Sequence, residues 1–219
     1  MKNIMTKRFV VTAMAAVLLG SSLTACLPLI MGGAVVGGTL VASDRRTSGA
    51  QLEDEGIELR SSSRLRSNVG DRVHVNVNSY NRQVLLTGEV PTAQDKLLVE
   101  QIVSKVENVT SVVNELAVLS STNLTQRSSD VLVTGRVRAM LVDAKDLFAN
   151  SFKVVTERGT TYLMGRVTQR EADRGTAVAR GTPGVQKVVR IFEIISEEDL
   201  ARQLPTPAKP PTAAKPAAN

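Results

Sequence analysis

The chain contains one sequence pattern twice, and this internal repeat limits the folds that it can adopt. One copy includes VHVNVNSYNRQVLLTGEVPT, residues 73–92, and the other includes NSFKVVTERGTTYLMGRVTQ, residues 150–169. When Gly88 is aligned with Gly165, hydrophobic residues coincide on both sides of the two glycines. Two copies of about 65 residues are too few for a solenoid, which needs at least three stacked repeats. The repeat therefore predicts two small tandem domains.

Each copy shows the same changes of hydrophobic period along the chain. Val73, Val75 and Val77 alternate with polar residues, as in a half-buried strand. A polar turn, SYNR or ERGT, separates this first strand from a second one, QVLLTGEV or TYLMGRV, which predicts a hairpin. A last strand is expected in each copy, at residues 111–119 and 186–195.

Helices are expected before and after each hairpin. Residues 57–69 and 130–147 have amphipathic spacing ahead of the two hairpins. After the first hairpin, Pro91 and Thr92 open a helical stretch, and after the second, Thr168 and a glutamate three residues on resemble a capping box. The order is α-β-β-α-β, twice. It predicts an α+β fold in which a small mixed sheet packs against helices.

The amino-terminal residues predict export and lipid attachment. A basic start and an apolar run at residues 9–19 have the lengths of a secretory signal. Leu-Thr-Ala-Cys then resembles the bacterial lipobox, in which the cysteine becomes the first residue of the mature chain and is acylated. Cys26 is the only cysteine, so no intrachain disulfide can form. We interpret Cys26 as the site of lipidation, with palmitate among the attached chains; the alternative is a free thiol after an ordinary cleaved signal. Leu27, rather than aspartate, follows it and favours sorting to the outer membrane.

The chain divides into five segments on composition. A glycine-interrupted apolar run, residues 27–42, is too short for a confident membrane span. The last residues are rich in Pro, Ala and Lys, cannot build a core, and are expected to be disordered. The segments are a lipoprotein signal peptide at 1–25, a lipidated Gly-rich tether at 26–46, a first domain at 47–124, a second domain at 125–196, and a disordered tail at 197–219.

The residues that usually perform catalysis are scarce. His74 is the only histidine, and its place within an alternating strand indicates a structural or exposed side chain. With one histidine and one lipidated cysteine, neither a cysteine–histidine pair nor a His/Cys zinc site can form. Glu53, Asp54 and Glu55 directly precede a predicted helix, whose amino terminus they would favour electrostatically. No nucleophile elbow or phosphate-binding glycine motif is present. We therefore expect no enzyme activity, no metal site and no cofactor.

Charge differs between the two predicted domains. Residues 47–124 carry seven Lys and Arg against ten Asp and Glu, a net charge of −3. Residues 125–195 carry twelve against seven, a net charge of +5. The chain has no tryptophan and two tyrosines, too few aromatics for a stacking platform, so nucleic acid is not an expected partner. At an anionic bilayer each well-placed Lys or Arg contributes about 1 kcal/mol, which favours the second domain as the lipid-facing one.

The first helix of the second domain is the candidate contact. Val131, Leu132 and Val133 are apolar, and Arg136 and Arg138 follow one turn later. Apolar side chains beside cations are typical of helices that lie in a membrane interface. An ordinary amphipathic helix, with its apolar side on the sheet, remains the alternative at this point.

The repeated elements carry a family resemblance. Hairpins that end in Leu-x-Gly-x-Val, followed by a helix and by Asn/Gly-Val-x-x-Val, resemble the BON domain of bacterial envelope proteins. A lipobox followed by two such domains resembles the DolP-type lipoproteins, most specifically in VTERGTTYLMGRVTQREA, residues 155–172. The resemblance implies a periplasm-facing, outer-membrane lipoprotein that supports envelope integrity and acts at the division site. It also implies that the helix with Val131, Leu132, Val133, Arg136 and Arg138 contacts an anionic phospholipid such as phosphatidylglycerol. Leu132 stands where that family often has tryptophan.

A different class of function remains open on the sequence. The chain can also be interpreted as a periplasmic protein-interaction module that assists assembly of envelope proteins, with the membrane reached only through the acyl chains. In that case the acidic first domain or the candidate helix would meet a protein partner.

Overall fold

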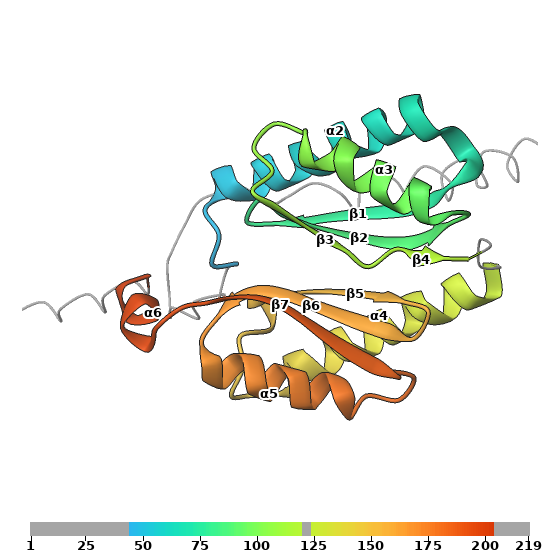
Figure 1. The fold of residues 1–219 in the computed structure, drawn as a ribbon. Coiled ribbons are helices and arrows are strands. Elements are labelled where there is room, and N and C mark those ends of the chain that lie inside the picture. The colour runs from blue at the N-terminus through green and yellow to red at the C-terminus, as the bar shows by residue number, and fades with distance from the viewer. Residues whose placement is uncertain (1–43, 120–123, 204–219) are drawn as a thin grey trace, which may run out of the picture. The chain divides into compact units, whose positions relative to one another are not determined.

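The structure is a computed structural model that describes residues 44–119 and 124–203 of the chain. Figure 1 shows two sheets, each with helices packed against one face. The predicted α+β class and the pair of small tandem domains are confirmed. The predicted signal peptide, the lipidation at Cys26 and the tether up to residue 43 lie outside the described residues, as do residues 204–219 of the predicted tail.

The first domain places two helices over a sheet of four strands. β1 and β2 form the predicted antiparallel hairpin, and β3 and β4 run parallel to β2. After α2, one turn of 3-10 helix leads into the sheet. The elements are α2 (Ser48–Val69), β1 (His74–Tyr80), β2 (Gln83–Val90), α3 (Ala93–Ser104), β3 (Ser111–Asn114) and β4 (Ala117–Val118).

The second domain repeats this order with one fewer strand. β5 and β6 are the antiparallel hairpin, and β7 runs parallel to β6 along its whole length. The expected capping box is confirmed, with Thr168 as the N-cap residue of α5 and Glu171 as its partner. The elements are α4 (Leu124–Asp143), β5 (Phe152–Glu157), β6 (Thr160–Val167), α5 (Gln169–Arg180), β7 (Lys187–Ile194) and α6 (Glu197–Gln203).

Several element boundaries differ from the sequence prediction. α2 begins at Ser48 because the Thr47 hydroxyl caps it, so Glu53, Asp54 and Glu55 lie within the helix and not ahead of it. α4 likewise spans 124–143 and not 130–147. The last strand of the first domain is interrupted, since the side chain of Asn114 accepts a hydrogen bond from the Leu116 N–H and turns the backbone aside.

The predicted disordered tail is corrected at its beginning. Residues 197–203 form α6, which the Ser196 hydroxyl opens by accepting a hydrogen bond from the Asp199 N–H at 3.0 Å. The side chain of Leu200 is buried, and its burial stabilises the helix. Three acidic residues in its first turn suit the positive end of the helix dipole.

Each domain has its own hydrophobic core, and a third cluster joins the two sheets. Along β2, Val84, Leu86 and Val90 contact the helices of the first domain. Leu85 points to the opposite face of the strand, because successive side chains alternate. There it belongs to the third cluster, which also contains Tyr80 of the first domain and Tyr162, Met164 and Ile191 of the second.

A buried aspartate supports the hairpin turn of the first domain. Asn81 and Arg82 both have positive φ, which matches the twist of a two-residue hairpin but costs energy for residues other than glycine. Asp54 of α2 accepts hydrogen bonds from both backbone N–H groups at 2.8 Å and from the Ser79 hydroxyl at 2.6 Å. Burial alone would raise the pKa of Asp54, but these bonds and one from Arg46 hold it below its usual value.

The second domain repeats this arrangement. Asp130 of α4 accepts hydrogen bonds from the backbone N–H groups of Arg158 at 2.8 Å and of Gly159 at 3.0 Å, and both turn residues again have positive φ. The helix preceding each hairpin therefore fixes the turn through one carboxylate. This repeated interaction explains why each of these two helices has an aspartate on its buried face.

Two arginines just before α2 reach both domains. Arg45 forms a two-pronged ion pair with Glu171 at the start of α5, with distances of 2.7 and 2.8 Å. Arg46 pairs with Asp54 of α2 at 2.6 Å, and its guanidinium lies 4.1 Å from the ring centre of Tyr80. The chain entering the first domain is therefore bonded to the second domain as well.

No helix among residues 44–119 and 124–203 is long and apolar enough to cross a membrane.

Candidate membrane-contact surface

The helix α4 is apolar on two opposite sides. On the inner side, Val133, Val137 and Leu141 recur at a spacing of four and are buried against the sheet. On the outer side, four apolar side chains face solvent, because no described residue covers them. These are Leu124, Val131, Leu132 and Val142, with 78%, 71%, 61% and 68% of their surface exposed, and we call them the outer strip of α4.

Two cations flank the outer strip. At 100° per residue, Arg136 and Arg138 fall on opposite sides of the line through Val131 and Val142. Both arginines are exposed, and neither forms a salt bridge with any described residue. The guanidinium of Arg138 donates a hydrogen bond to the Val154 carbonyl at 3.1 Å, which holds it at the edge of the helix.

Of the five residues expected to contact lipid, four are exposed and one is buried. Val131, Leu132, Arg136 and Arg138 lie on the exposed part of α4. Val133 does not: it is 3% exposed, lies in the core of the second domain and packs near Gly184. Both expected roles of the helix, packing on the sheet and exposing apolar residues, thus coexist on different faces.

Sequence reasoning missed the two ends of the outer strip. Val142 lies eleven residues after Val131, three helical turns on, and so falls on the same side. The sequence contains this spacing, but it does not distinguish the outer side from the inner side, because both sides carry valine and leucine. Leu124 was assigned to the end of the first domain, whereas it begins α4.

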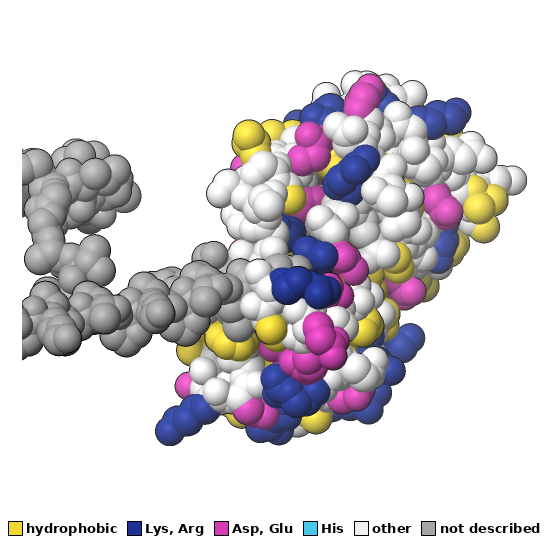
Figure 2. All heavy atoms as spheres, turned by 90° about the vertical axis from the view of Figure 1, so that its left-hand side faces the viewer, with side chains coloured by type: hydrophobic (Ala, Val, Ile, Leu, Met, Phe, Trp, Pro, Cys, Tyr) yellow, Lys and Arg dark blue, Asp and Glu magenta, His cyan; other side chains and the backbone are white. Residues whose placement is uncertain are grey.

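Most other cations of the second domain are paired with acids. Examples are Arg166 with Glu193 and Arg174 with Asp146, both at 2.9 Å. Figure 2 shows positive and negative side chains interleaved on the face it presents, without a broad patch of one sign. The net positive charge of the domain is therefore not spread evenly, and Arg136 and Arg138 differ from these cations in forming no salt bridge with a described residue.

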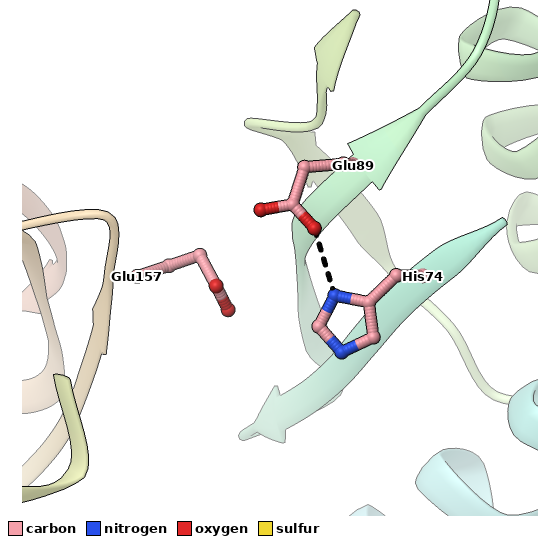
Figure 3. Close-up of side chains that lie close together, drawn as sticks. All are labelled: His74, Glu89 and Glu157. Atoms are coloured by element: carbon pink, nitrogen blue, oxygen red, sulfur yellow. Dashed lines mark hydrogen bonds and ion pairs between the residues drawn. The ribbon is translucent and has the colours of Figure 1, made fainter. Parts of the chain in front are cut away.

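A second group of polar residues meets where the two sheets face each other. His74 of β1 and Glu89 of β2 are direct cross-strand partners, with 2.9 Å between Nδ1 of the ring and Oε2 of the carboxylate. Figure 3 shows the carboxylate of Glu157, from β5 of the other domain, pointing toward this pair. A ring nitrogen of His74 and one carboxylate oxygen from each glutamate all lie within 4.8 Å of one another.

Gly88 precedes Glu89 and lets the two strands approach closely. It has φ of +112°, and a side chain there would collide with the carbonyl oxygen of His74. At Gly165 in the second domain a side chain would collide with the carbonyl oxygen of Ser151. Close strand packing accounts for both glycines, as their recurrence in the two copies suggests.

Comparison with known proteins agrees with the repeated architecture. The model of the BON domain matches residues 53–120 and again 129–195. The outer membrane lipoprotein DolP of Haemophilus influenzae is 35% identical over 185 residues, which cover 82% of this chain and 95% of that protein. The 21 kDa hemolysin of Actinobacillus pleuropneumoniae is 30% identical, with coverage of 69% and 79%. Among solved structures, the C-terminal domain of CdsD from Chlamydia trachomatis is 14% identical with a TM-score of 0.27, and the match covers 63% of this chain and 96% of that one.

Proposed function

Because the chain belongs to the BON-domain family, as a dual-BON protein of the DolP type, we propose that it is an outer-membrane lipoprotein whose second domain binds anionic phospholipid. It faces the periplasm, is anchored through acylated Cys26, and supports envelope integrity, with enrichment at the division site. The observation that carries the lipid contact is the outer strip of α4 between Arg136 and Arg138.

The outer strip is suited to a membrane in both chemistry and shape. Each of its exposed side chains would gain about 1.5–3 kcal/mol on complete burial. The two flanking arginines add about 1 kcal/mol each at an anionic surface. A helix that lies in the interface needs this combination of apolar centre and cationic edges.

The proposed anchor lowers the affinity that the helix must supply. Once the acyl chains hold the protein at a bilayer, a second contact becomes intramolecular and benefits from a high effective concentration. Leu132 is a weaker interfacial residue than tryptophan. We therefore expect binding without the anchor to be modest, and Leu132→Trp to strengthen it.

Vesicle flotation tests the lipid contact. The segment 44–219, which lacks the proposed anchor, is mixed with vesicles of phosphatidylcholine alone or with phosphatidylglycerol added. We expect recovery only with the anionic vesicles. Arg136→Glu combined with Arg138→Glu should weaken binding by about 30-fold or more, since at least about 2 kcal/mol is lost. Val131→Ser combined with Leu132→Ser should weaken it similarly.

Matched variants distinguish binding through the outer strip from nonspecific adsorption of the protein to vesicles. Leu52 and Leu59 of α2 are 70% and 73% exposed, so Leu52→Ser with Leu59→Ser removes at least as much exposed apolar surface, from the first domain. Arg180→Glu with Lys187→Glu reverses two exposed charges elsewhere on the second domain. Both controls should bind as the parent does. Equal recovery with neutral and anionic vesicles, or equal loss in controls and test variants, contradicts the proposal.

The protein-interaction alternative has its own signature. A photo-crosslinker at Leu132 in intact cells should give lipid adducts if the outer strip lies on the membrane. A dominant adduct with one envelope protein would support a role in assembly of envelope proteins instead.

A further inference from the structure

We propose that His74, Glu89 and Glu157 bind one divalent transition-metal ion where the two domains meet. This inference is independent of lipid binding, because the three residues lie on β1, β2 and the end of β5, and none belongs to α4. No metal site was expected from the sequence, because one histidine and one lipidated cysteine cannot form a His/Cys site. The fold adds two carboxylates from distant positions to the single histidine.

The geometry is close to that of a bound ion. His74 and Glu89 stand opposite each other on adjacent strands, so the sheet itself holds two ligands on one face. Zinc ligands lie about 2.0–2.2 Å from the metal, which places neighbouring ligand atoms of a tetrahedral site about 3.3–3.5 Å apart. The observed 2.9 Å between the ring and Glu89 would lengthen slightly on binding, and Glu157, within 4.8 Å of both, would move inward.

The local charge favours a cation. Glu89 is 1% exposed and Glu157 is 9% exposed, so two carboxylates are withdrawn from solvent side by side. Of the nearby cations, Arg158 lies 3.6 Å from Glu89, but its side chain is 39% exposed and can turn outward. A divalent ion would neutralise both carboxylates.

The donor set points to a transition metal. Carboxylates alone suit magnesium and calcium, whereas an imidazole among the ligands favours zinc or another first-row divalent ion. The side-chain amide of Asn76 donates a hydrogen bond to Oε2 of Glu157 at 2.8 Å and orients that carboxylate. Such outer contacts are typical of metal ligands, because they fix the position of the coordinating group.

An open pocket gives the ion a route from solvent. It has a volume of about 670 Å³, and His74 and Glu89 form part of its wall together with Arg72 and Arg127. Three protein ligands leave a tetrahedral ion one further position, which a water molecule from this pocket can fill. The site therefore meets the requirements of ligands, charge and access.

Binding would tie the two domains together. Two ligands come from the first domain and one from the second, so the complete site exists only when the domains are packed as observed. A ligand that binds only the folded, packed form stabilises that form by mass action.

Metal binding is measured on the full mature protein, purified in detergent without a polyhistidine tag. Equilibrium dialysis against zinc chloride, with zinc quantified by mass spectrometry, should show one ion per chain with a dissociation constant on the order of micromolar. At saturating zinc the melting temperature should rise by about 5 °C or more relative to the protein in EDTA. His74→Gln and Glu157→Gln should each abolish the uptake and the shift.

Controls separate a lost ligand from a lost fold. Glu55→Gln changes an exposed carboxylate on α2 and should leave the zinc content unchanged. In EDTA, Glu157→Gln should melt close to the parent, because glutamine has nearly the same shape and its carbonyl oxygen can still accept the hydrogen bond from Asn76. Absence of zinc from the parent protein, or equal uptake by both ligand variants, overturns the proposal.

Discussion

Arg45 and Glu171 lie 126 positions apart in the sequence and form a buried two-pronged ion pair. The Glu171 side chain has no exposed surface, and that of Arg45 is 8% exposed. The same carboxylate also accepts a hydrogen bond from the Thr168 N–H at 3.0 Å and so completes the cap of α5. One glutamate thus stabilises a helix start and holds the segment that leads into the other domain.

Replacing Arg45 should destabilise the protein strongly. Arg45→Ala leaves Glu171 buried with only the more distant and exposed Arg170, 3.9 Å away, and loss of one partner of a buried pair costs about 3 kcal/mol or more. Urea unfolding measures the change. Arg174→Ala is the control, because it breaks an exposed pair with Asp146 and should cost less than about 1 kcal/mol. Similar losses for the two variants would show that the Arg45 pair contributes no more than a surface contact.

Asp54 should stabilise the first domain in a pH-dependent way. Asp54→Asn weakens the bonds to the hairpin turn and is expected to cost about 2 kcal/mol at pH 7. The pKa of Asp54 is lower in the folded protein than its usual 3.8, so its contribution is complete above that value. It is lost as the pH falls through the folded pKa.

Urea unfolding at a series of pH values checks this prediction. The difference between the parent and Asp54→Asn should be constant near neutrality and shrink below about pH 3.8. Glu55→Gln, on the exposed side of the same helix, should have little effect at any pH. A difference that grows on acidification would contradict the assigned role.

Two Gly→Ala changes should have opposite effects. Gly88→Ala forces a side chain into positive φ and against the His74 carbonyl, which should cost about 3 kcal/mol. At Gly135 on α4, a side chain would meet nothing within 4 Å, so Gly135→Ala should stabilise the protein by about 0.5–1 kcal/mol. Thermal unfolding of both variants decides the matter, and a stable Gly88→Ala protein would refute the packing argument.

The sequence predicted the elements well because their signals are local. The hairpins follow from alternating valines and polar turns, and the cap of α5 follows from Thr168 and Glu171 three residues apart. The role of Asp54 was missed because a carboxylate near a helix start is usually explained by the helix dipole. Its actual partners, Asn81 and Arg82, come from a distant turn.

The contacts between the two domains could not be predicted from the sequence. Nothing in the sequence around His74 or Glu157 indicates that the two side chains meet, because the packing of one sheet on the other sets their separation. A weak signal was present in QVLLTGEV, where Leu85 and Leu86 interrupt the alternation and indicate a strand buried on both faces. It indicated that a second face is covered, but not by which residues.

The position of Arg45 and Arg46 has a mechanical consequence. Any pull on the chain from its amino-terminal side meets the pairs with Glu171 and Asp54 before it reaches the first turn of α2 at Ser48. The load is therefore shared between the two domains and is borne by charged side chains, while the backbone hydrogen bonds of α2 remain shielded from it.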